Sequence, residues 1–87
     1  GIDDESIRGK VLGSLLKEFT HAVMHPEEHL SRLLLPFIPL QYRVGTDAAV
    51  EQKIQTVLDF VSGMTDVYAL DLYRKINGSN VTGKRLN

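Results

Sequence analysis

The chain has 87 residues, no cysteine, no tryptophan and a formal net charge of -1. Its length suits one small domain. The lack of cysteine excludes a disulfide framework, a cysteine-ligated zinc and a thiol nucleophile. Its 10 basic and 11 acidic residues do not indicate a nucleic-acid partner, since phosphate binding depends on an excess of clustered basic side chains. No apolar run approaches the ~20 residues of a membrane-spanning helix, and no signal peptide is recognisable, so we expect a cytoplasmic protein without a membrane partner.

The first residue is Gly1 instead of Met, which is typical of a domain released from a longer polypeptide or from an expression tag. The small size agrees with that interpretation, and we expect an excised fragment. We interpret residues 1–87 as a single helical domain and residues 79–87, which are polar and contain glycine, as a flexible tail.

Apolar residues recur with helical spacing through the first quarter of the chain. They are Ile7, Val11, Leu12, Leu15, Leu16, Phe19, Ala22 and Val23. Asp3 or Asp4 is suited to cap the start of this helix, and we expect it to end near Met24 because Pro26 disfavours a helical His25. The apolar arc covers close to half of the helix circumference, so the helix needs more than one packing partner.

Gly9 and Gly13 lie beside this arc, four residues apart. They would let a neighbouring helix approach closely. The alternative is two tolerated glycines that each cost ~1 kcal/mol relative to alanine.

A second, shorter helix is predicted to begin at Pro26, which suits the first helical position, and to run towards Leu35. Pro36 and Pro39 then prevent a long regular element across residues 36–43. This connector is largely apolar, and we expect four of its side chains to be buried: Phe37, Ile38, Leu40 and Tyr42.

Residues 45–47 (Gly-Thr-Asp) indicate a loop that leads into the cap of a third helix. Its apolar stripe comprises Val50, Ile54, Val57, Leu58 and Val61, with Phe60 at the margin. At Gly63 the apolar face changes, and we favour a break capped by Thr65 or Asp66 over one continuous helix wrapped on several sides. The apolar residues beyond it are Tyr68, Ala69, Leu70, Leu72, Tyr73 and Ile76.

The last helix is expected to stop at Asn77-Gly78. No strand pattern and no internal repeat occur in the sequence. We therefore predict an all-α fold, a small domain of three to four helices.

His21, His25 and His29 recur every four residues and would align three imidazoles on one unbroken helix, a pattern known from zinc sites. Pro26 interrupts that helix, so His29 need not share a face with His21. We favour polar surface over metal binding, and keep a zinc-binding domain as an alternative.

Residues 58–70 read LDFVSGMTDVYAL and are the most specific stretch of the chain. This segment resembles the C-terminal signature of the dGTP triphosphohydrolases, the dGTPase branch of the HD superfamily, in which Gly-Met-Thr/Ser-Asp precedes a Tyr-Ala pair. Residues 72–74 continue the match, and residues 35–36 and 41–42 fit a preceding Leu-Pro…Gln-Tyr segment. The first helix adds only a compatible pattern.

The resemblance implies a parent enzyme that hydrolyses dGTP, or dNTPs more broadly, to a deoxynucleoside and tripolyphosphate. It also implies a divalent metal, Mg²⁺ or Mn²⁺, held by His, His-Asp and Asp ligands. No His-Asp dipeptide occurs in this chain, since His21, His25 and His29 are followed by Ala, Pro and Leu. We therefore assign no catalytic residue, metal ligand or cofactor to these residues and expect the isolated chain to be inactive.

The resemblance further implies a C-terminal fragment that packs against the parent catalytic domain and takes part in a homo-oligomer. The candidate packing face is Tyr68, Leu70, Leu72 and Tyr73. Asp66, Tyr68 and Arg43 are candidates for a substrate pocket or an interface, beside simple capping by Asp66 and packing by Tyr68. The alternative function is a stand-alone helical protein-interaction module with no catalytic role.

Overall fold

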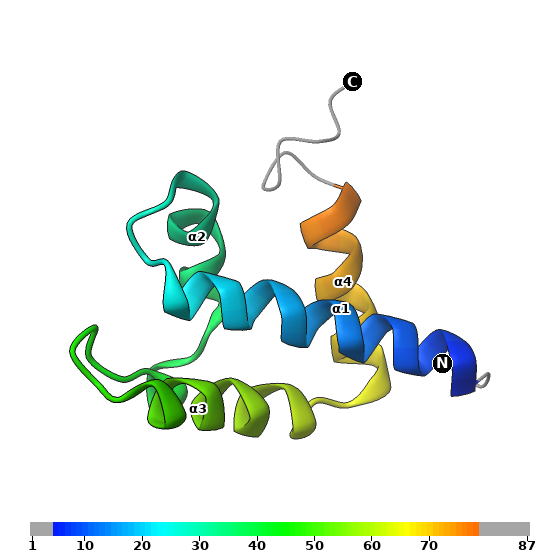
Figure 1. The fold of residues 1–87 in the computed structure, drawn as a ribbon. Coiled ribbons are helices and arrows are strands. Elements are labelled where there is room, and N and C mark those ends of the chain that lie inside the picture. The colour runs from blue at the N-terminus through cyan, green and yellow to red at the C-terminus, as the bar shows by residue number, and fades with distance from the viewer. Residues whose placement is uncertain (1–4, 79–87) are drawn as a thin grey trace.

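The computed structural model describes residues 5–78, and this part of the chain contains helices and no strand (Figure 1). The helices are α1 (Glu5–Met24), α2 (His29–Leu34), α3 (Val50–Ser62) and α4 (Asp66–Gly78), with short 3₁₀ turns η1 (Leu35–Phe37) and η2 (Leu40–Tyr42). The predicted all-α fold is confirmed. The proposed Asp3 or Asp4 cap and the predicted tail 79–87 lie outside the described residues. None of the helices within residues 5–78 is long and apolar enough to cross a membrane.

Helix α1 is the element around which the others are arranged. It crosses the middle of the molecule and packs against α2, α3 and α4 (Figure 1). Its buried residues are Val11, Leu15, Phe19 and Ala22, spaced three or four residues apart along one face. The wide apolar arc therefore does need several partners, as its width predicts. Only the first turn departs from the prediction, since Ile7 is half exposed.

The centre of the core is a cluster of aromatic rings. Phe19 has no exposed surface, and its ring meets that of Phe60 edge-on, with centroids 5.4 Å apart. Tyr42 of η2 packs against the same Phe60 ring at 5.7 Å. The placement of Phe60 at the margin of its stripe was wrong: α3 is turned so that Phe60, Val57 and Val61 face inward. A large ring buries more apolar surface than an aliphatic chain, which favours this rotation.

The connection between α1 and α2 differs from the predicted one. The Glu28 backbone N–H donates to the His25 carbonyl oxygen at 3.2 Å, which closes a turn that has Pro26 at its second position. Proline is favoured there, so Pro26 starts a turn, and α2 begins only at His29. The helix predicted to start at Pro26 is therefore shorter than expected.

The later connector is partly as predicted. Pro36 and Pro39 limit it to two single 3₁₀ turns, and Ile38 is buried while Phe37 and Tyr42 are partly buried. Leu40, predicted to be buried, is 80% exposed. The predicted side-chain cap of α3 is also not found, because its N-cap is Ala49, which offers no side-chain hydrogen bond.

The glycines of α1 yield the first testable prediction. A Cβ atom at Gly9 or Gly13 would meet no atom within 4 Å, so no helix of the described chain approaches closely there. Gly13→Ala should therefore raise the free energy of unfolding by about 1 kcal/mol, because alanine loses less backbone entropy on forming a helix. Thermal denaturation should show a melting temperature roughly 4–8 °C higher.

Gly63→Ala is the matched control for this measurement. A Cβ at Gly63 would lie 3.3 Å from the Asp59 carbonyl oxygen and 3.7 Å from the Tyr42 hydroxyl. This variant should show no gain in stability. An equal gain in both variants would contradict the explanation.

Candidate functional site

The segment from Gly63 to Tyr68 forms a sharp, well-defined break between α3 and α4. Gly63 follows the last residue of α3, and its N–H donates to the Asp59 carbonyl oxygen at 3.2 Å. Thr65 caps α4, because its Oγ1 accepts the Tyr68 backbone N–H at 3.1 Å. The predicted break at Gly63 is thus confirmed, with Thr65 as the capping residue.

Asp66 occupies the first turn of α4, where its negative charge is favourable, and does not serve as the cap. Its Oδ1 lies 3.4 Å from Nε of Arg8 on α1, a partly exposed ion pair. Such a pair adds little stability but joins the starts of the two helices. Tyr68 is half exposed and lines a shallow depression with Met64 and Gly63.

Arg43, the third sequence candidate, is placed by the connector. Its Nε donates to the Ile38 carbonyl oxygen at 2.6 Å, and its Nη2 donates to the Pro36 carbonyl oxygen at 3.3 Å. Arg43 and Tyr68 line different pockets. The structure therefore does not bring Asp66, Tyr68 and Arg43 into one described pocket.

The four residues of the candidate packing face differ in burial. Leu72 is buried within the chain's own core, and Leu70 and Tyr73 are partly buried against that core. Of these four residues, Tyr68 is the one that remains half exposed.

The pocket beside Arg43 has a volume of about 440 Å³. Arg32 of α2, Arg43 of the connector and Lys53 of α3 are its three cationic lining residues, and no carboxylate lines it. Apolar side chains, among them Leu35 and Ile38, make up much of the remaining wall. Sequence reasoning missed this pocket, because Arg32 and Lys53 lie on different helices and only the fold brings them together.

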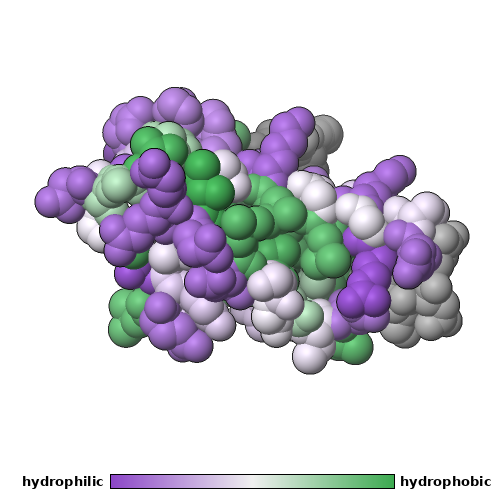
Figure 2. Space-filling view, turned by 60° about the horizontal axis from the view of Figure 1, so that its bottom comes forward, coloured by the Kyte–Doolittle hydropathy of each residue, from purple (hydrophilic) through white to green (hydrophobic). Residues whose placement is uncertain are grey.

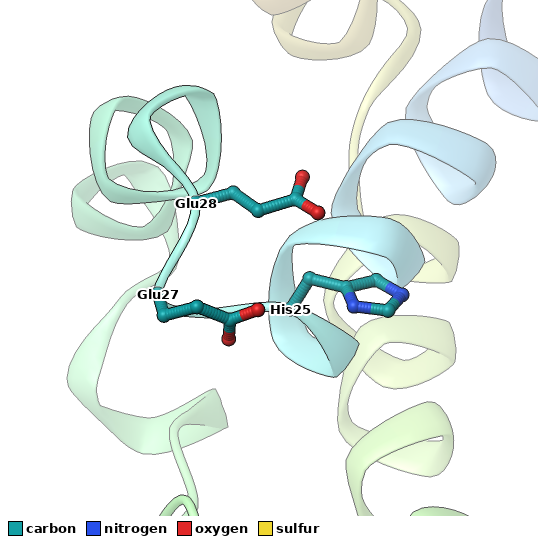
Figure 3. A group of neighbouring side chains, drawn as sticks. All are labelled: His25, Glu27 and Glu28. Atoms are coloured by element: carbon teal, nitrogen blue, oxygen red, sulfur yellow. The ribbon is translucent and has the colours of Figure 1, made fainter.

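A cluster of metal-ligating side chains surrounds the turn between α1 and α2. Donor atoms of His25, Glu27 and Glu28 all lie within 4.8 Å of one another (Figure 3). His21 Nε2 lies 2.8 Å from Glu28 Oε1, and this hydrogen bond holds the pKa of the Glu28 carboxyl below its usual value. His29, which the spacing grouped with His21 and His25, does not belong to the cluster among the described residues.

An apolar stripe on α3 remains exposed. It consists of Val50, Ile54 and Leu58, which are 49%, 37% and 42% exposed. Residues four apart lie on one face of a helix, so the three form a single strip, which we call the α3 stripe. Figure 2 turns the α3 side of the molecule towards the viewer and shows that apolar side chains gather on this face among polar ones.

Comparison with known proteins agrees with the signature found in the sequence. Residues 14–75 match the family model of the phosphohydrolase-associated domain. A deoxyguanosinetriphosphate triphosphohydrolase-like protein of Synechocystis sp. (strain PCC 6803) is 34% identical over 70 residues, which are 79% of this chain and 16% of that protein. The chain thus spans less than a fifth of the length of this relative. No solved structure matches this chain.

The cap at the start of α4 yields a second prediction. Thr65→Ala removes the oxygen that accepts the Tyr68 N–H and should lower the free energy of unfolding by about 1 kcal/mol. Chemical denaturation of the 87-residue chain measures the change. Thr65→Ser keeps a hydroxyl at the same position and should retain most of the stability. Equal losses in both variants would show that the methyl group, and not the cap, matters.

Proposed function

The chain belongs to the phosphohydrolase-associated domain family, and we propose that it is the helical packing and oligomerisation domain of a dGTP triphosphohydrolase-like enzyme. That enzyme hydrolyses dGTP, or dNTPs more broadly, to a deoxynucleoside and tripolyphosphate in the cytoplasm. The matched relative, a deoxyguanosinetriphosphate triphosphohydrolase-like protein, supports this proposal. The catalytic divalent metal, Mg²⁺ or Mn²⁺, does not fit on these residues, since the chain has no His-Asp dipeptide. No catalytic step is therefore assigned to them.

The exposed α3 stripe is the observation that carries the packing role. Val50, Ile54 and Leu58 are aligned on one helix face, and within residues 5–78 they remain 49%, 37% and 42% exposed. Contiguous apolar surface on a small domain is typical of an interaction site. The matched relative is several times longer than this chain, so in a parent protein of similar length the remaining part is the surface that would cover the stripe. Tyr68, half exposed on α4, extends the proposed interface.

The test is a charge placed in the α3 stripe of the full-length enzyme. In the isolated 87-residue chain, Ile54→Glu should cost about 1 kcal/mol and lower the melting temperature by roughly 4–8 °C, because Ile54 is 37% exposed and loses only its partial burial. In the full-length enzyme the same change buries an unpaired carboxylate and should reduce oligomer formation and dGTP hydrolysis at least tenfold, by roughly 1.4 kcal/mol or more. Light scattering and release of tripolyphosphate measure the two effects.

Gln52→Glu is the matched control, because it introduces the same charge at an exposed position of the same helix. It should change neither assembly nor turnover. If Ile54→Glu behaves like this control in the full-length enzyme, the stripe is not an interface. If the reading frame upstream of Gly1 encodes no His…His-Asp…Asp set, the chain is a stand-alone interaction module instead.

The pocket beside Arg43, which we call the cationic pocket after its lining residues Arg32, Arg43 and Lys53, supports a second candidate function. We also propose that it binds the phosphates of a nucleotide, with Arg32, Arg43 and Lys53 facing an anionic, partly apolar ligand. Arg43 is already fixed by two carbonyl oxygens, whereas the Arg32 and Lys53 side chains form no hydrogen bond or ion pair with any other residue of the described range 5–78. Arg32 and Lys53 would supply the attraction for phosphate.

Calorimetric titration of the chain with dGTP, without added metal, tests this second candidate. Lys53→Ala and Arg32→Ala should each weaken binding about tenfold, which corresponds to the loss of one charge-assisted contact of roughly 1.4 kcal/mol. Lys10→Ala removes an exposed cation from α1 and should leave the affinity unchanged. Binding that is absent, or that is equally sensitive to Lys10→Ala, would rule out a dedicated phosphate site.

A further inference from the structure

Two histidines at the end of α1 offer their imidazoles in the same direction. His21 and His25 are one helical turn apart, and their ring centroids lie 4.6 Å from each other. Both side chains are exposed, so the rings can turn without disturbing the core. A histidine pair at this spacing supplies two nitrogen ligands to one metal ion in many zinc proteins.

The turn after α1 brings two carboxylates to the same place. Because the turn at Pro26 reverses the chain, Glu27 and Glu28 extend back towards the last turn of α1, as Figure 3 shows. The donor atoms of His25, Glu27 and Glu28 lie within 4.8 Å of one another. His21 is not one of these three, but it contacts two of them: its Nε2 is 2.8 Å from Glu28 Oε1, and its ring lies near that of His25. Glu28 is the N-cap residue of α2 but forms no side-chain cap hydrogen bond there. Its carboxylate is hydrogen-bonded to His21 instead.

We propose that His21, His25, Glu27 and Glu28 form a zinc site that joins the end of α1 to the start of α2. Tetrahedral zinc with bonds of about 2.0 Å needs ligand atoms roughly 3.3 Å apart. Rotation of four exposed side chains can close the present separations, and zinc then replaces the His21–Glu28 hydrogen bond. Two carboxylates and two neutral imidazoles carry a charge that a divalent ion balances. Imidazole ligands favour zinc over Mg²⁺, which prefers oxygen.

Zinc at this place would stiffen one wall of the cationic pocket. Val23 and Pro26 line that pocket, and both lie within the segment that the four ligands enclose. The chain between α1 and α2 is otherwise closed by a single backbone turn and one exposed hydrogen bond. The zinc site is independent of the proposed packing role, and the isolated chain suffices to test it.

The experiment uses the tag-free 87-residue chain, stripped of metal with a chelator. Zinc is titrated by calorimetry, and the melting temperature is measured with zinc at about 100-fold above the dissociation constant. Since zinc binds the folded turn, the melting temperature should rise by roughly 10–20 °C. His21→Ala and His25→Ala should each weaken zinc binding at least tenfold. Glu27→Gln with Glu28→Gln should also weaken it.

His29→Ala is the matched control, because His29 is exposed, close in sequence and outside the cluster. It should bind zinc as the parent chain does. Co²⁺ should bind in place of zinc and show the visible absorption of a tetrahedral site, lost in His25→Ala. The proposal is overturned if zinc does not bind in a saturable 1:1 manner, if His29→Ala weakens binding as much as His25→Ala does, or if Mg²⁺ raises the melting temperature equally.

Discussion

The structure depends on the burial of one wide apolar face on α1. Phe19 sits at its centre with no exposed surface, and the edge-on contact with Phe60 joins α1 to α3. Because a single neighbouring helix covers only part of so broad a face, α2 and α4 must also pack against it. The fold is therefore organised around α1, and the other helices contact each other less.

This arrangement explains where the candidate sites lie. Helix α3 uses its Phe60 side to reach α1, which leaves the opposite edge of its apolar stripe, Ile54 and Leu58, uncovered. At the C-terminal end of α1, the turn at Pro26 reverses the chain and places Glu28 against His21. The α3 stripe and the histidine–carboxylate cluster are thus both consequences of how the other helices pack around α1.

Membership of the phosphohydrolase-associated domain family gives these surfaces a context. The chain carries the family signature around Gly63 and Thr65, yet that signature is built from a helix stop and a helix cap. Its chemistry is structural: it sets the direction in which α4 leaves α3, and with it the position of Tyr68 and of the Asp66–Arg8 ion pair. In the described structure, Gly63 and Thr65 of this segment therefore act on the backbone, as a helix stop and a helix cap.

The amino-acid sequence by itself determined the features that depend on neighbouring residues. Helical periodicity defined α1, prolines interrupted the connector, and the break at Gly63 followed from local backbone chemistry. The sequence left the cap of α4 open between Thr65 and Asp66, and the structure decided for Thr65. Only the tertiary structure decided which edge of α3 is buried, that Leu40 is exposed, and that Arg32 and Lys53 share a pocket. Periodicity shows that a face is apolar, but the rotation of a helix depends on the shape of the partner that covers it. The candidate sites combine residues from separate elements, so they became visible only once those elements were packed.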